Sequence, residues 1–471
     1  MKLKFLWVVI VSGNLFFLAH TTAAAPVMAF TANTYAVGAG PMSVAVGDFN
    51  GDGKIDLVTA NYDNGAGRTL TVLTNNGTGG FGSNATFTVG TPFPFVPPEG
   101  FYQAPWSVTV VDVNQDGKPD LVSANYTSGA GNRLTVMTNN GAGIFSSNAI
   151  LTVGSGPKCV AAGDVNGDGK IDLISANYSA GTLTILTNAG NGTFGFNATL
   201  QTVKNSGFVV AADLNNDGKL DLFSVSEDSA TSMPTISKLV IFTNSGSGIF
   251  GSNATLNLPG VSRQAAAVDV NGDGKMDIVA YAALNGVASL VVFTNNGIGN
   301  FSLSAGFPLT RDMSFSLTTA DVNGDGKIDF ISANADYRMT ILINDGSGNF
   351  SLFSLPQVGK KPYSTAAADV NGDGKMDFIT ANNFDNTVTV LTQTNAALPA
   401  LNIAVRTNMV SVSWQSPVTG FILQTNSDLN TTNWSVAPYL TSYAVFTSNG
   451  VSQGFVATSL PPDKLFFRFK P

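Results

Sequence analysis

The sequence predicts an all-β protein: a seven-bladed β-propeller closed by an N-terminal strand and followed by a small β-sandwich domain. Three observations lead to this prediction. An acidic nine-residue motif occurs seven times at intervals of 48 to 64 residues, each copy is flanked by short alternating segments and turn residues, and no convincing amphipathic helix separates the copies. Repeats of this length are typical of solenoids, propellers and arrays, and four short strands per repeat make one propeller blade.

The N-terminus has the features of a secretory signal peptide. Lys2 and Lys4 precede an apolar run from Phe5 to Ala19, and small residues follow it. The run has 15 residues, whereas a membrane span needs about 20, so an uncleaved anchor is the less favoured alternative. We therefore expect residues 1–25 to be removed near Ala24 or Ala25, leaving a secreted, extracellular or cell-surface protein with no membrane insertion.

The scarce residue types exclude several functions. The chain has 471 residues, of which 11 % are charged, with one cysteine and one histidine. One thiol cannot form a disulfide framework within the chain, and His20 lies in the expected signal peptide, so the mature chain lacks the imidazole of a Ser-His-Asp triad. A net charge of -8 and the lack of a Lys/Arg cluster disfavour nucleic-acid binding.

Each repeat contains the motif Asp-x-Asn-x-Asp-Gly-Lys-x-Asp. Its seven copies span residues 48–56, 112–120, 164–172, 213–221, 269–277, 321–329 and 369–377. A strand of small residues precedes the motif, two alternating strands follow it, and a Gly-x-Gly-x-Phe turn leads into a fourth strand. Small residues suit the innermost strand, where the blades converge on the axis. Cys159 occupies a position that is serine in four other repeats, so we interpret it as a small buried residue.

The seventh repeat lacks its fourth strand. Its last alternating segment ends near Thr392, whereas residues 30–38 resemble the fourth strands 81–90 and 145–154. The N-terminal segment is therefore predicted to complete the seventh blade, which removes two exposed sheet edges. This places the propeller at residues 26–396.

The motif has the composition of a calcium loop. Aspartate at positions 1, 5 and 9 and asparagine at position 3 supply hard oxygen ligands, while glycine at position 6 permits a sharp turn. Without a cation each loop would crowd three carboxylates together. A set of Asx and glycine turns is the alternative. The loop is not an EF-hand, because position 12 is never glutamate.

The acidic loops and the Gly-x-Gly-x-Phe turns resemble the FG-GAP and VCBS repeats of integrin α-chain heads and of many secreted bacterial proteins, over about residues 30–393. The resemblance implies up to seven structural Ca²⁺ ions held by positions 1, 3, 5 and 9. The implied ligands are Asp48, Asn50, Asp52, Asp56, Asp112, Asn114, Asp116, Asp120, Asp164, Asn166, Asp168, Asp172, Asp213, Asn215, Asp217, Asp221, Asp269, Asn271, Asp273, Asp277, Asp321, Asn323, Asp325, Asp329, Asp369, Asn371, Asp373 and Asp377. The second copy differs at Gln115 and Pro119, neither of which is a side-chain ligand.

Strand direction sorts the connections onto two faces. The acidic loops and glycine turns share one face, and the other is left for recognition. The longest connection to that other face, residues 91–105, combines aromatic rings with a carboxylate, as sugar sites do. The candidate ligand-binding residues are Glu99, Phe101, Tyr102, Trp106, Tyr337 and Arg338. A proline-stiffened loop that packs its own aromatic rings is the alternative.

Residues 397–471 have a different pattern. The acidic loops stop, and short alternating segments continue to the C-terminus. They predict a small β-sandwich, loosely similar in fold to fibronectin type III or immunoglobulin modules.

These features favour a monomeric, non-enzymatic adhesion or recognition protein that is stabilised by calcium and binds a glycan or a surface protein. The alternative is an extracellular polysaccharide lyase or glycosidase, which would need clustered acidic or basic groups. The candidates for such a cluster are Glu99, Glu227, Asp228, Asp336 and Arg338.

Overall fold

The computed structural model describes residues 5–11, 14–20, 27–63, 67–89, 103–127, 131–226, 237–284, 287–309, 314–396 and the strands between 401 and 470. Two compact units are present: residues 30–393, and residues 1–29 together with 394–471. Every helix or strand that the structure describes is a β-strand. The described residues include no helix that is long and apolar enough to cross a membrane.

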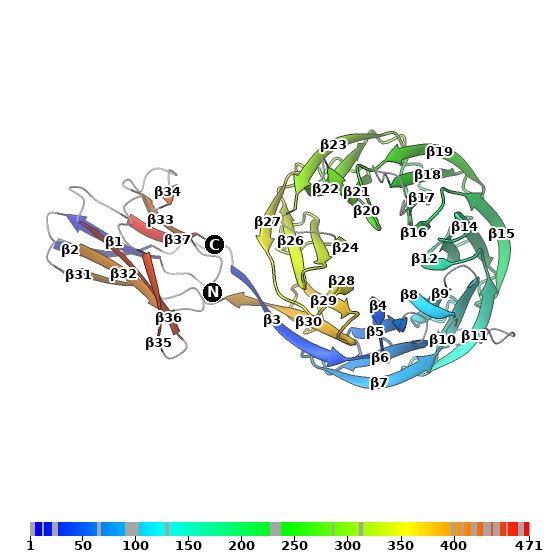
Figure 1. Cartoon of the computed structure of the whole chain (residues 1–471), viewed down its shortest axis with the longest axis horizontal. Helices are drawn as coiled ribbons and strands as arrows, with labels where there is room; N and C mark the ends of the chain where they lie inside the picture. The colour runs from blue at the N-terminus through cyan, green and yellow to red at the C-terminus, as the bar shows by residue number, and fades with distance from the viewer. Residues whose placement is uncertain are drawn as a thin grey trace. The chain divides into compact units, whose positions relative to one another are not determined.

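Residues 30–393 form a ring of seven four-stranded antiparallel sheets (Figure 1), as the sequence predicts. The innermost strands are β4 (Pro41–Gly47), β8 (Ala104–Val111), β12 (Pro157–Gly163), β16 (Ser206–Ala212), β20 (Ala265–Val268), β24 (Ser314–Ala320) and β28 (Pro362–Ala368). The second strands are β5 (Asp56–Asn61), β9 (Asp120–Tyr126), β13 (Asp172–Asn177), β17 (Asp221–Ser226), β21 (Asp277–Leu284), β25 (Asp329–Asn334) and β29 (Asp377–Asn382).

The outer half of each blade follows the same order. The third strands are β6 (Thr69–Asn75), β10 (Arg133–Asn139), β14 (Thr182–Asn188), β18 (Lys238–Asn244), β22 (Val287–Asn295), β26 (Arg338–Asn344) and β30 (Thr387–Ala396). The outermost strands are β7 (Phe81–Thr88), β11 (Phe145–Thr152), β15 (Phe194–Gln201), β19 (Phe250–Asn257), β23 (Phe301–Pro308), β27 (Phe350–Ser354) and β3 (Val27–Ala36). Each second strand begins at the last aspartate of a motif.

The N-terminal strand closes the ring. The seventh sheet has the order β28-β29-β30-β3, so β3 supplies the strand that the last repeat lacks. Figure 1 shows β3 beside β30, which comes from the other end of the propeller sequence. Backbone and side-chain bonds fasten this joint, with Val37 N donating to Asn386 O at 3.0 Å and Thr392 Oγ1 to Thr31 O at 3.3 Å. The closure predicted from the sequence is confirmed.

The hydrophobic core lies between neighbouring blades. One cluster joins Val58 and Val72 of the first blade to Val108 and Leu121 of the second, and equivalent clusters follow around the ring. Second strands such as β5 and β9 are buried along almost their whole length, because both of their faces contact other blades. Burial of this apolar area is the main source of stability for such a fold.

A buried aspartate and an asparagine join each blade to the preceding one. In the third blade Asp172 Oδ2 accepts from Val165 N at 3.1 Å, and Oδ1 accepts from Asn188 N at 2.8 Å. The Asn188 amide then donates to Ile171 O at 2.9 Å and, across the blade boundary, to Val113 O at 2.7 Å. We call this set of bonds the blade clasp.

The blade clasp recurs in all seven blades. The residues at the Asn188 position, with their acceptors in the preceding blade, are Asn75 (Val370), Asn139 (Phe49), Asn244 (Val165), Asn295 (Leu214), Asn344 (Val270) and, in the last blade, Gln393 (Val322). The Gln393 amide, oriented to satisfy both carbonyls, lies 2.9 Å from Met376 O and 3.2 Å from Val322 O. The first-blade clasp reaches the seventh blade, so this interaction also closes the ring.

At one position of the inner strands, the predicted small residue is replaced by a large one in two blades. The position of Ser43 and Ser107 is occupied by Phe208 in the fourth blade and by Gln264 in the fifth. Gln264 reaches across the gap to the next blade, where its Oε1 accepts from Leu317 N at 2.8 Å. The expectation that only small residues fit next to the axis is therefore wrong at these two positions.

The second unit contains a hairpin and two sheets. Strands β1 (Phe5–Val11) and β2 (Asn14–His20) pair antiparallel within the segment expected to be a signal peptide, whose cleavage stays a prediction. The C-terminal strands are β31 (Leu401–Arg406), β32 (Met409–Gln415), β33 (Ile422–Asn426), β34 (Ser435–Val436), β35 (Tyr443–Ser448), β36 (Val451–Ser459) and β37 (Phe466–Lys470). They form sheets of order β31-β32-β36-β35 and β34-β33-β37, the strand content of the expected sandwich.

The blade clasp makes a testable prediction. Asn188→Ala removes two donors and leaves the carbonyls of Val113 and Ile171 short of a buried partner, which costs about 2 kcal/mol. We expect the thermal midpoint of the propeller to fall by several degrees in calorimetry. Asn191→Ala, in an exposed turn of the same blade, is the control and should change the midpoint little. Equal midpoints for the two variants would contradict a stabilising role for the clasp.

Candidate functional site

The acidic loops are compact turns closed by their own carboxylates. In the first loop Asp48 Oδ1 accepts from Gly51 N at 2.8 Å and Asp52 N at 3.1 Å, while Oδ2 accepts from Gly53 N at 2.8 Å. Asn50 Oδ1 accepts from Asp52 N at 3.0 Å. Gly53 has a φ of 80°, a left-handed conformation that explains glycine at position 6.

The last aspartate of each motif is buried at the base of its loop. Burial raises the pKa of this carboxyl group in every copy; two backbone N–H donors oppose the shift, and the nearby aspartates of the same loop add to it. For Asp377 the pKa reaches about 6. The loop carboxylates are therefore close enough to repel one another.

The lysine at position 7 neutralises part of each loop. Lys54 Nζ lies 3.3 Å from Asp52 Oδ2, and the equivalent pair recurs in the other six loops at 2.7 to 3.8 Å. All of these pairs are solvent-exposed and contribute little to stability. Three aspartates and one lysine leave each loop with a formal charge of about -2, so this face of the ring is strongly acidic.

The donors in the loops suit calcium chemically, although the aspartates do not converge. Among the described residues, no three His, Cys, Asp or Glu side chains are grouped so that they could hold a metal ion. The position-9 carboxylate instead bonds the backbone of its own blade. Calcium takes six to eight oxygens, including amide and carbonyl oxygens and waters. An ion in this loop would thus draw on position 3 and on backbone oxygens as well as on the exposed carboxylates.

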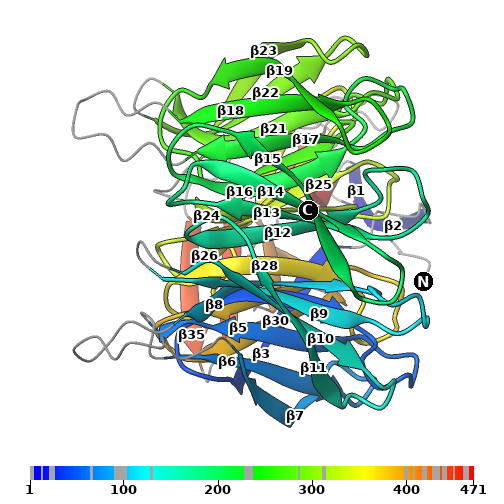
Figure 2. The same cartoon turned by 90° about the vertical axis from the view of Figure 1, so that its right-hand side faces the viewer.

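On the opposite face of the ring, the described charged side chains are mainly basic. Seen from the side (Figure 2), the strands run between two faces, and the turns between second and third strands lie on the face away from the acidic loops. The described charged residues of this face are nine basic and three acidic side chains. They are Arg68, Arg133, Lys158, Lys204, Lys238, Arg263, Arg338, Lys360 and Lys361, against Asp63, Asp336 and Asp385.

Four aromatic rings form a cluster on this basic face, and Lys158 lies against three of them. The Trp106 ring centroid lies 5.0 Å from that of Tyr62 and 5.1 Å from that of Tyr126, and Tyr126 lies 6.2 Å from Tyr178. Lys158 Nζ lies 3.3 Å from the Tyr178 centroid and 4.7 Å from the Trp106 centroid. Cation–π attraction of this kind holds the ammonium group against the rings.

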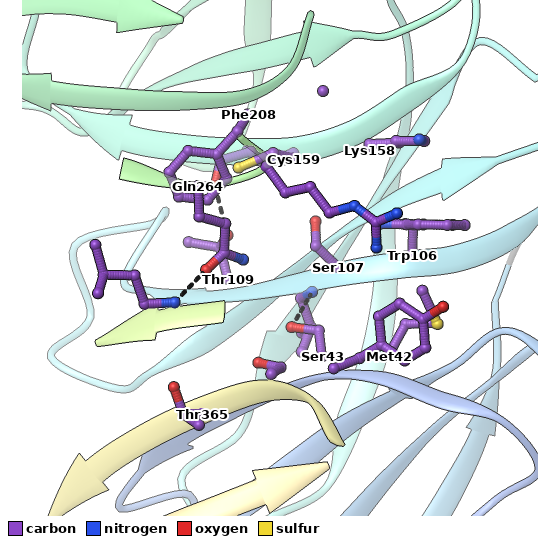
Figure 3. A pocket seen from close by; sticks show the side chains of 17 residues that line it. Met42, Ser43, Trp106, Ser107, Thr109, Lys158, Cys159, Phe208, Gln264 and Thr365 are labelled. Carbon is purple, nitrogen blue, oxygen red and sulfur yellow. Dashed lines mark hydrogen bonds between the residues drawn. The ribbon is translucent and has the colours of Figure 1, made fainter. Parts of the chain in front are cut away.

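Two neighbouring cavities open at the centre of the ring. The first, of about 360 Å³, is lined by residues of all seven blades, among them Trp106 and Lys158 (Figure 3). Arg263 also lines it. The second, of about 400 Å³, is lined by turns of the basic face and includes Asp63, Lys361 and Phe384. Met42, Trp106 and Tyr363 line both cavities. Sites for small ligands have volumes of about 300–1,000 Å³.

The structure places only some of the residues predicted to bind a ligand. Trp106 contributes to both cavities. Tyr337 is 42 % exposed at the turn before β26, and Arg338 Nη1 lies 3.5 Å from Leu355 O, so both belong to the sixth blade and line neither cavity. Glu99, Phe101, Tyr102, Glu227 and Asp228 lie outside the described residues.

Sequence reasoning missed most of the central cluster. Tyr62, Tyr126 and Tyr178 share one position, at or just after the end of the second strand, in three consecutive repeats. Trp106 and Lys158 likewise share the position after the first proline of the inner strand. Both positions vary between repeats, and aligning the seven copies to find variable positions next to the axis would have revealed them.

Comparison with known proteins supports the repeat assignment. A family model described as an FG-GAP-like repeat matches residues 48–123, 112–175, 164–224, 213–280 and 321–380, together more than half of the chain. No curated protein matches the sequence. Each matched range begins at the first aspartate of an acidic motif.

Several solved structures have a similar fold. Crystal structures of BBS1N in complex with ARL6DN, soaked with mercury or with lead, show 12 % identity and TM-scores of 0.54 and 0.52 over 79 % of this chain and 99 % of the other. A protein from Lactobacillus plantarum shows 14 % identity and a TM-score of 0.50 over 77 % and 98 % of the two chains. At such identities the likeness shows the fold alone.

Cys159 provides a test of the cavity wall. Cys159 is half-buried in the wall of the first cavity, and desolvation there raises the pKa of its thiol to about 11. Only the thiolate reacts with alkylating reagents. At pH 8 we expect iodoacetamide to label the native chain about 100-fold more slowly than an unperturbed thiol, with labelling rising as the pH approaches the raised pKa. The denatured chain is the control, and equal rates for native and denatured protein would contradict the burial.

Proposed function

The chain belongs to the FG-GAP-like repeat family, and from this premise we propose that it is an exported, non-enzymatic recognition protein. Its acidic loops hold structural Ca²⁺, and its basic face binds a glycan or a surface protein. The observation that carries the proposal is the chemical division of the ring: seven acidic loops lie on one face, while basic and aromatic side chains surround cavities on the other.

Calcium is the cation that the loops suit best. Each copy offers hard oxygens from positions 1, 3 and 5, with position 9 at the base, and such oxygens in flexible turns favour Ca²⁺ over Mg²⁺. The mutual repulsion that helps to raise the pKa of the position-9 carboxyl would be relieved by a divalent ion. In this proposal the ion has a structural role and takes part in no reaction. It neutralises the charge of the loop, while the blade clasp holds the base of that loop in place.

Recognition on the opposite face rests on the fold and on the cavities. BBS1N has a similar fold and was crystallised in complex with ARL6DN, so a fold of this kind serves protein recognition there. The basic face carries partly exposed aromatic rings together with cations, which are typical of binding surfaces. We propose that the mature protein acts outside the cell as a monomer, where millimolar calcium suits loops of modest affinity.

Removal of calcium should destabilise the propeller. At ten times the dissociation constant each bound ion adds about 1.4 kcal/mol to the free energy of unfolding. We therefore expect excess EGTA to lower the thermal midpoint by many degrees and calcium to restore it. Identical melting curves with EGTA and with calcium would count heavily against metal-stabilised loops.

A single-loop variant gives a stoichiometric test of the same proposal. Asp164→Asn combined with Asp168→Asn removes two carboxylates from the third loop, so native mass spectrometry should find one calcium ion fewer. Asp345→Asn changes an aspartate outside the motifs on the same face and should leave the count unchanged. Loss of an ion from the control, or the same count in both proteins, would show that the motif aspartates are not the ligands.

A binding screen tests the recognition function. The full chain in calcium should be retained selectively by some glycan or matrix protein on an array, without release of shortened product. Shortened oligosaccharides would instead indicate a polysaccharide-active enzyme, and a lack of any selective retention would contradict recognition.

A further inference from the structure

The two cavities adjoin each other. Met42, Trp106 and Tyr363 line both, so they stand between the first cavity, which we call the channel, and the second, which we call the rim. We define the channel mouth as Trp106, Lys158, Arg263, Lys361, Tyr363 and Phe384. These residues come from the first strands of four blades and from the turns beside them, so only the closed ring brings them together.

The charge of the channel mouth favours an anion. Three cations, Lys158, Arg263 and Lys361, stand among the described residues that line the cavities, and Asp63 is the acidic side chain among them. Lys158 is only 7 % exposed, and a charge so shielded from solvent is screened by salt less than a charge on an open surface. A ligand carboxylate or sulfate would gain charge-assisted hydrogen bonds there.

The aromatic rings and the hydroxyl groups that line the cavities favour a sugar as the molecule that carries the anionic group. Phe384 is 63 % exposed at the rim, with Lys361 Nζ 4.1 Å from its ring centroid. A pyranose can place its C–H face on such a ring while a neighbouring cation meets its acidic group. Deeper in the channel, Ser107 Oγ is buried and has no hydrogen-bond partner among the described residues, so it suits a ligand hydroxyl.

We propose that the channel mouth binds an anionic saccharide, a sugar chain that carries carboxylate or sulfate groups. Cations at the rim and in the channel pair with the acidic groups, while Trp106 and Phe384 contact the sugar faces. This inference rests on the proposed recognition function, because it names the ligand class of the same face.

The test uses matched acidic and neutral sugars. Trigalacturonate and its fully methyl-esterified form share the same rings and differ in charge, as do a heparin-type tetrasaccharide and its desulfated form. Calorimetry with the full chain in calcium should give binding of at least one acidic probe that is tenfold or more tighter than that of its neutral partner. Rising salt concentration should weaken the acidic probe selectively. Equal affinities within both pairs, or no binding of either acidic probe, would overturn the proposal.

Variants then locate the site. Lys361→Met and Lys158→Met should each weaken the acidic probe about tenfold, and Phe384→Ala should weaken acidic and neutral probes alike. Lys238→Met removes one exposed charge from the same face outside the channel mouth and should leave the affinity within twofold. If Lys158→Met disturbs the packing of the aromatic cluster, the two variants at the rim, Lys361→Met and Phe384→Ala, still test the proposal. Equal losses in Lys238→Met would show diffuse attraction to a basic face and would overturn the assignment.

A hexa-aspartate peptide separates the remaining outcomes. Binding of this peptide as tightly as of the acidic sugars, with the same loss in Lys361→Met, would identify an acidic-peptide site and overturn the saccharide assignment. An array ligand that binds without competition from the acidic probes would leave the recognition function standing while this inference fails. Failure of the recognition function would appear as the lack of any selective array ligand.

Discussion

The blade clasp is the interaction on which the rest of the structure depends. A buried carboxylate is costly unless donors surround it, and in each blade the last motif aspartate accepts two backbone N–H groups. One of these comes from the residue whose amide holds the preceding blade, as Asn139 holds Phe49 O at 2.9 Å. The clasp thus fixes three features together: the base of the acidic loop, the end of the third strand and the spacing between blades. Because the clasp recurs in all seven blades, these non-covalent bonds help to hold the ring closed.

This constraint divides the molecule into a repeated part and a variable part. The loop face carries the acidic motif in every blade, and the clasp uses the last aspartate of each copy. The ends of the strands on the opposite face carry no such requirement. The position of Met42 in the first blade is accordingly tryptophan, lysine, glycine, arginine, phenylalanine or tyrosine in the other six blades. A rigid scaffold that leaves one face free to vary is the usual arrangement for binding sites. The position of the channel mouth follows from this division.

The sequence predicts most of what is repeated and little of what is unique. The blade count, the closing strand and the loops could be predicted, because each rests on a pattern seen several times. In the sequence the clasp asparagine could be recognised only as a turn residue, because the carbonyl group that it contacts lies about 80 residues earlier in the chain. Asn244, for example, donates to Val165 O. Lys158 and Phe384 gave no signal, because an isolated lysine and an isolated phenylalanine acquire meaning only when the ring closes. Trp106 was found because it follows an unusual connection, not because its neighbours were foreseen.

The second strands link the two faces mechanically. Strand β9 begins at the clasp aspartate Asp120 and ends at Tyr126 in the aromatic cluster. Its far end is also fixed, because Ser123 Oγ donates to Asn125 Oδ1 at 3.1 Å and the Asn125 amide donates to Thr135 Oγ1 at 2.8 Å. A buried strand held at both ends moves little without unfolding. Tyr126 is therefore held in place beside Trp106 of the channel mouth, with 5.1 Å between the ring centroids, and such preorganisation reduces the entropy lost on binding.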